Sequence, residues 1–176
     1  MKKTLLFVML SNFAFASFGQ SKNDILKEIF DYRKKIVSIA TYDKKETEVW
    51  NAIYIIATEE YNTIVKESES KGYIEAKLEK DTYKESITIE ILGNEAPYRV
   101  SFQVKKESRT KKDDGTYTNW SDGGSVSEKY FTKLQLRLYE LLNGTLELSK
   151  ELQAKVDNFN SLQDKDRKKI VKGKDY

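Results

Sequence analysis

Residues 87–105 read ITIEILGNEAPYRVSFQVK, and this stretch decides the fold. Apolar and polar side chains alternate on both sides of a five-residue turn that contains Gly93, Asn94 and Pro97. Such alternation is typical of strands with one buried face and one face in water. Because a turn this short joins neighbouring strands directly, the stretch predicts a hairpin in an antiparallel sheet that helices cover on one side.

A second pair of strands precedes this hairpin. Residues 63–66 and 73–78 again show a period near two, and a polar turn over 68–72 separates them. Gly72 supplies the backbone freedom that a tight turn needs. We therefore expect a sheet of four to six strands.

Two helices are well marked by the spacing of their apolar residues. The helix over 43–60 opens with Asp43 and Glu46, which form a variant of the capping box. The helix over 126–142 ends at Asn143-Gly144, a usual C-terminal stop. Both are expected to pack across the sheet.

Two further helices flank these elements. Asn23 or Asp24 can cap the first helix, although its last third, residues 36–41, also fits a strand. Thr145 can cap the last helix, which gives way to a polar sequence near Asp164.

The elements together predict an α+β fold, with an antiparallel sheet of four to six strands and helices packed mainly on one face. A single domain is expected over residues 20–163, followed by a polar, basic tail over 164–176. If residues 1–19 are removed, about 157 of the 176 residues remain, which suits one domain with its own hydrophobic core.

Residues 1–19 have the pattern of a cleaved signal peptide. Lys2 and Lys3 precede an uncharged apolar run over 4–16, and small residues follow where a signal peptidase cuts. Ala14 and Ala16 offer one cleavage site, and Ser17 and Gly19 offer a second, preferred one. The apolar run is shorter than the roughly 20 residues of a membrane-spanning helix, so we expect export of a soluble periplasmic or secreted protein.

The absence of cysteine and histidine narrows the chemistry. Without cysteine the chain has no lipidation point and no disulfides, so no membrane anchor is expected. Without either residue it cannot build a Ser-His-Asp triad, a thiol nucleophile or the usual zinc site. No cofactor motif is present, and removing Lys2 and Lys3 lowers the formal charge from +3 to about +1, which does not favour a nucleic-acid partner. We expect a protein that is not an enzyme.

The segment over 105–125 is the candidate for recognition of a protein partner. It is rich in charged and turn-forming residues, and Tyr117, Asn119 and Trp120 lie within it. Aromatic residues concentrate at binding hot spots, so these three residues are the candidate partner-binding site. The alternative is that Trp120 folds back over the sheet edge or over the helix at 126–142.

Two other functions stay open. A small apolar ligand or lipid could be carried between the sheet and the helix over 126–142, in a pocket lined by Tyr98, Phe102, Tyr130 and Leu134. A weaker alternative is a glycan hydrolase that uses two carboxylates. The first choice is a non-enzymatic binding module.

Two features resemble known proteins. The end of the signal peptide, Phe18-Gly19-Gln20, is similar to those of exported Bacteroidota proteins. The order of elements over 48–104 resembles small periplasmic domains of unknown function with a BamC-like or TATA-binding-protein-like α+β layout. The resemblance implies a fold and no functional residue, and the missing lipidation cysteine departs from BamC-like proteins.

Overall fold

The computed structural model describes the backbone of residues 22–172 and the side chains of residues 22–161. The signal peptide predicted over 1–19 and the last four residues of the predicted tail lie outside this range. The chain divides into two compact units: residues 33–146, and a second unit in which residues before 33 associate with residues after 146. The single domain predicted over 20–163 stays a prediction.

The larger unit is built on a five-stranded antiparallel sheet in the order β1-β2-β3-β4-β5. Its strands are β1 (Thr63–Ser68), β2 (Tyr73–Glu79), β3 (Tyr83–Leu92), β4 (Arg99–Ser108) and the short β5 (Ser121–Asp122). The hairpin predicted from residues 87–105 is β3 and β4, which pair from Tyr83 opposite Ser108 to Leu92 opposite Arg99. The α+β fold class is confirmed.

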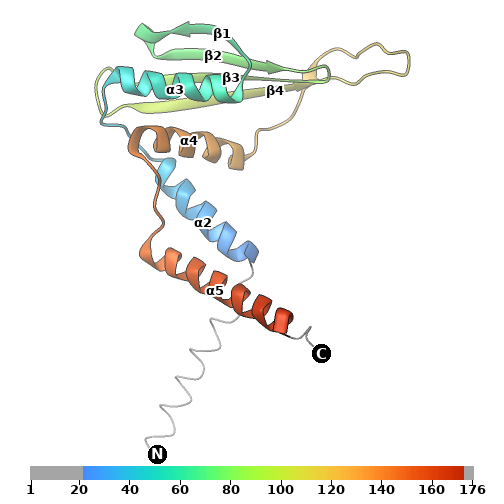
Figure 1. The fold of residues 1–176 in the computed structure, drawn as a ribbon. Coiled ribbons are helices and arrows are strands. Elements are labelled where there is room, and N and C mark those ends of the chain that lie inside the picture. The colour runs from blue at the N-terminus through green and yellow to red at the C-terminus, as the bar shows by residue number, and fades with distance from the viewer. Residues whose placement is uncertain (1–21, 173–176) are drawn as a thin grey trace, which may run out of the picture. The chain divides into compact units, whose positions relative to one another are not determined.

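Helices cover one face of this sheet. Figure 1 shows α3 (Glu46–Glu60) and α4 (Glu128–Asn143) side by side against it. The buried side chains come from alternate positions of β2 and β3 and from one side of each helix: Val49, Ile53, Ile56, Ile74, Ile87, Ile89, Leu134 and Leu138. Salt bridges from Lys133 to Glu60 at 2.7 Å and from Arg137 to Glu59 at 2.6 Å join the exposed sides of the two helices.

Two of the predicted helix caps are wrong. The N-cap of α3 is Lys45, and its backbone N–H donates to the Glu48 carboxylate at 3.0 Å, so the box starts two residues after Asp43. The last helix, α5 (Lys150–Lys172), follows Ser149, whose hydroxyl accepts from the Leu152 N–H, and not Thr145. The helical backbone of α5 also continues beyond Asp164, where the tail was expected to begin.

The smaller unit contains the start of α2 (Lys22–Val37) and all of α5. Its described contacts include a salt bridge between Lys155 and Glu28 at 2.9 Å and a hydrogen bond from the Tyr32 hydroxyl to the Glu147 carbonyl at 3.3 Å. Ile25 and Leu152 are buried. Residues 36–41, which also fitted a strand, contain the end of α2 and a turn that leads to Tyr42.

Across residues 22–172, no helix is both long enough and apolar enough to cross a membrane.

Candidate functional site

The segment between β4 and β5, residues 109–120, is an ordered hairpin, here called the arm. Thr110 and Thr118 are joined by backbone and side-chain hydrogen bonds of 2.9 Å, and Lys111 bridges to Tyr117. At the tip, the Asp114 carboxylate accepts from the backbone N–H of Thr116 at 2.9 Å. Figure 1 shows the arm extending beyond the ends of β1, β2 and β3.

Arg109 holds the aromatic side chains of the arm together. Its guanidinium lies 4.4 Å from the ring centroid of Tyr117 and 4.4 Å from that of Trp120. Its Nε donates to the Asp81 carbonyl at 2.6 Å, and its backbone N–H donates to the Thr82 carbonyl at 3.0 Å. The stack is therefore anchored to the turn between β2 and β3.

Two lysines extend the stack at its ends. Lys84 Nζ lies 4.5 Å from the Trp120 ring centroid, and Lys111 Nζ lies 5.9 Å from that of Tyr117. Cations placed over aromatic faces attract the electron-rich ring, by about 0.5–1 kcal/mol where the pair is exposed. We call these five residues, which alternate cation and ring, the arm stack: Lys84, Trp120, Arg109, Tyr117 and Lys111.

The arm stack brings together two of the three residues predicted to bind a partner. Tyr117 and Trp120 are half-buried, and Asn119 beside them is exposed. Trp120 packs against cations of β3 and the arm, not within the hydrophobic core. Sequence reasoning missed Lys84, because it is separated from the arm by a full strand, and it passed over Arg109.

A buried carboxylate lies on the opposite face of the same strand. Glu85, next to Lys84 on β3, is 5% exposed and faces the helices. The hydroxyl of Tyr61, just after α3, donates to Glu85 Oε1 at 2.7 Å, and the hydroxyl of Tyr83 donates to Oε2. The hydroxyl of Tyr130 on α4 lies 3.0 Å from that of Tyr61, and Lys106 Nζ lies 3.6 Å from Glu85 Oε2. We call this group the Glu85 cluster.

The Glu85 cluster holds a charged carboxylate at the sheet–helix interface. Burial by itself raises the pKa of Glu85, but hydrogen bonds from the three tyrosines and the charge of Lys106 outweigh it, so the pKa lies below its ordinary value. Burial, followed by the hydrogen bond that the Tyr83 hydroxyl donates to Glu85, raises the pKa of Tyr83. At neutral pH the cluster therefore contains an ionised carboxylate and neutral phenols.

The four residues predicted to line an apolar pocket belong to the core or pack against it. Leu134 and Tyr98 are buried in it, and Phe102 and Tyr130 are partly buried against it. The pockets near Trp50, near Tyr73 and near Leu152 are lined by other residues. Tyr130 also turns its hydroxyl into the Glu85 cluster, and the carrier hypothesis stays a prediction.

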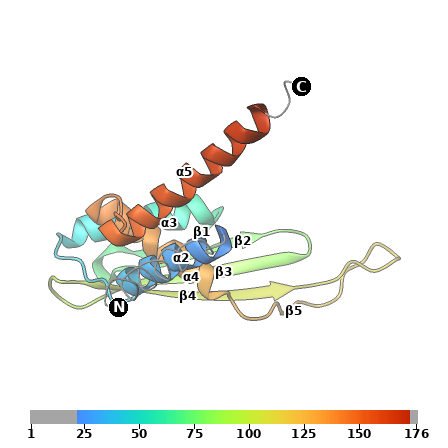
Figure 2. The same cartoon turned by 90° about the horizontal axis from the view of Figure 1, so that it is seen from below.

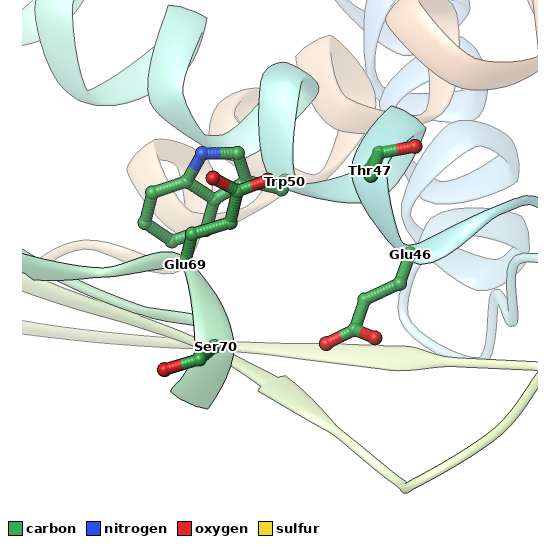
Figure 3. Close-up of a pocket in the computed structure, with 5 residues that line it drawn as sticks. All are labelled: Glu46, Thr47, Trp50, Glu69 and Ser70. Atoms are coloured by element: carbon green, nitrogen blue, oxygen red, sulfur yellow. The ribbon is translucent and has the colours of Figure 1, made fainter.

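A surface pocket of about 540 Å³ lies at the start of α3 and is lined by Glu46, Thr47, Trp50, Glu69 and Ser70. Figure 3 shows the carboxylates of Glu46 and Glu69 pointing in different directions. The hydrolase alternative, which needs two carboxylates on either side of one bond, stays a prediction. Trp50 is 8% exposed and mainly fills the core.

The acidic residues near the arm act in turns. The Asp122 carboxylate accepts from the Gly124 N–H at 2.9 Å, in the same way that Asp114 accepts from Thr116. Within the described part of the chain, no group of three or more His, Cys, Asp or Glu side chains is placed to hold a metal ion.

Comparison with protein-family models, with curated proteins and with solved structures finds no match for this chain.

Proposed function

We propose that the protein is an exported, non-enzymatic binding module that contacts a protein partner through its arm. The observation that carries the proposal is the arm stack, in which one guanidinium lies 4.4 Å from two aromatic ring centroids outside the core. Trp, Tyr and Arg are the residues that dominate the binding energy of protein interfaces. The arm presents all three together.

The order within the arm also supports this function. Its cross-strand hydrogen bonds and the anchor from Arg109 to Asp81 fix the rings before a partner arrives. A surface that is already ordered loses less conformational entropy on binding than a flexible loop. The half-buried rings therefore leave exposed area for a partner, and their binding loses little conformational entropy.

Site-specific photo-crosslinking in the organism that makes the protein tests the proposal. A photoreactive amino acid at Asn119 is expected to give a defined protein adduct, which disappears when Trp120→Ala is added. The matched control carries the same photoreactive group at Tyr54, an exposed aromatic position on α3. The absence of an adduct at 119, or the same adducts from both positions, would argue against recognition by the arm.

Export rests on the pattern of residues 1–19, with its two lysines, apolar run and small residues. N-terminal sequencing of the protein recovered from its own cells is expected to begin near Gln20. A chain that retains Met1 would contradict export by this route.

A further inference from the structure

The outer edge of β4 has a gap in its backbone hydrogen bonding. In an antiparallel strand the N–H and C=O of one residue point to the same side, and successive residues alternate between sides. Tyr98 exchanges two backbone hydrogen bonds with Tyr42, at 2.8 and 3.0 Å, and Lys106 O accepts from Gly123 N at 2.9 Å. The backbone N–H of Arg109 instead donates to the Thr82 carbonyl on the β3 side. The backbone N–H and C=O groups of the even-numbered residues of β4 therefore point outward, away from β3.

Three residues whose backbone groups point outward lie inside this gap: Val100, Phe102 and Val104. Their backbone groups have no hydrogen-bond partner among the described residues on the outer side of β4. Tyr42 closes the gap at one end. Gly123 closes it at the other, where its backbone lies so near β4 that a Cβ would come within 3.0 Å of Glu107 N. This stretch of unpaired strand edge, which has a defined length, is called the slot. Figure 2 shows β4 along one margin of the sheet, with the short β5 at one end of it.

The opposite margin of the sheet offers a poorer template. The pairing of β1 with β2 shifts between Ile64 and Lys66, which marks a bulge in the edge strand. Bulges interrupt the regular row of donors and acceptors that an added strand needs. The outer side of β4 keeps that regular row.

We propose that this slot binds an extended segment of another protein in which apolar and acidic residues alternate. Addition of a strand to a sheet edge gives affinity through the backbone and specificity through alternate side chains. On the helix side of the slot, Val100, Phe102 and Val104 are partly buried at the border of the core. On the open side, Arg99 and Lys105 lie near its two ends. The Lys105 side chain is 72% exposed and its Nζ lies 3.6 Å from Glu107 Oε1, so most of the ammonium surface stays open to a second carboxylate.

Charge decides against a second copy of the chain as the occupant. Two β4 strands that fill the slot by two-fold antiparallel pairing must be centred on Phe102, because Tyr42 and Gly123 block any longer shift. That register sets Arg99 of each copy opposite Lys105 of the other. Like charges directly opposite each other destabilise a strand pair, whereas carboxylates at these positions attract both cations.

Two seven-residue peptides test this surface. Acetyl-EVTVTVE-amide sets three valines against the apolar side of the slot and a glutamate near each of its two cations, and acetyl-KVTVTVK-amide differs only in the sign of its charges. The acidic peptide is expected to bind at least tenfold more tightly by calorimetry. It should also slow hydrogen exchange at the amides of Val100, Phe102 and Val104.

A charge-reversed protein provides the decisive comparison. The double variant Arg99→Glu with Lys105→Glu is expected to prefer the lysine peptide, and N-methylation of the central valine should abolish binding to either protein. Unchanged peptide preference, no binding of either peptide, or a stable dimer that protects the same amides would overturn the proposal. The Trp120→Ala variant does not change the residues of the slot, so this protein should still bind the acidic peptide. That result would distinguish binding at the slot from binding at the arm.

Discussion

The buried position of Glu85 could not be predicted from the sequence. The alternation that predicts β3 begins at Ile87, because a charged residue at 85 breaks the pattern of a core-facing strand. The strand nevertheless begins at Tyr83, and Glu85 faces the core. Its partners come from the end of α3, from β3 and from α4. No local pattern predicts a cluster whose residues lie so far apart in the sequence.

Glu85→Gln should lower stability by about 1–3 kcal/mol at pH 7, because the amide replaces a carboxylate that accepts hydrogen bonds in a buried site. Urea unfolding measures the change. Glu79→Gln is the matched control, since the Glu79 side chain is 50% exposed and its nearest cation is 3.9 Å away; a shift within about 0.5 kcal/mol is expected. Equal midpoints for Glu85→Gln and the wild type would refute the role of the cluster.

The stabilising effect of Glu85 should depend on pH. Since its pKa in the folded protein is below the ordinary value, the carboxylate contributes stability that is present above the unfolded pKa of roughly 4.3 and is lost as pH falls through the folded pKa. The difference in unfolding free energy between the wild type and Glu85→Gln is therefore expected to shrink from pH 7 toward pH 3. A difference that stays constant or grows on acidification contradicts this assignment.

At the scale of elements, sequence patterns confined to one segment correctly predicted where that segment turns or ends. The β1–β2 turn, the β3–β4 hairpin and the end of α4 at Gly144 lie where the sequence places them. The start of α3 was misplaced, because Asp43 and Lys45 both precede a glutamate by three residues and only the second pair forms the box. The cap depends on the path of the chain through Tyr42, which pairs with Tyr98.

Gly72 should be hard to replace. It has a φ of +58°, and a Cβ there would lie 2.7 Å from the Cβ of Ile91. Gly115 in the arm has a φ of +82° and open space around it, so its alanine variant pays only the backbone cost of about 1–2 kcal/mol. Gly72→Ala is expected to lose more stability than Gly115→Ala in thermal unfolding, and equal losses would show that Ile91 does not constrain the turn.

Arg109 should control the order of the arm with little effect on the core. In Arg109→Ala, the indole N–H of Trp120 is expected to become more mobile on the ps–ns timescale, as measured by a lower heteronuclear NOE. The indole of Trp50 is an internal control, since it lies in the core. Arg109→Lys should restore order only in part, because an ammonium lacks the planar group that stacks on rings. An unchanged Trp120 signal in Arg109→Ala would show that the stack does not hold the arm.

At the scale of the whole molecule, the sequence predicted the class of fold and two of the residues in the arm stack. Tyr117 and Trp120 stood out because polar surroundings left them no apolar neighbours. Their contacts with Arg109 and Lys84 depend on strand pairing across the β2–β3 turn, which sequence spacing does not reveal. The predicted pocket residues lie in the same core as buried side chains of α3, β2 and β3, or pack against that core.

The central claim is that the arm stack carries the binding energy for a protein partner. The most direct test is the Kd of the crosslinked partner, purified and measured against the wild type, Trp120→Ala and the control Tyr54→Ala. Loss of a hot-spot residue costs about 2 kcal/mol or more, so Trp120→Ala should weaken binding by at least about 30-fold, while Tyr54→Ala leaves it within about threefold. Equal affinities for all three proteins would contradict the account.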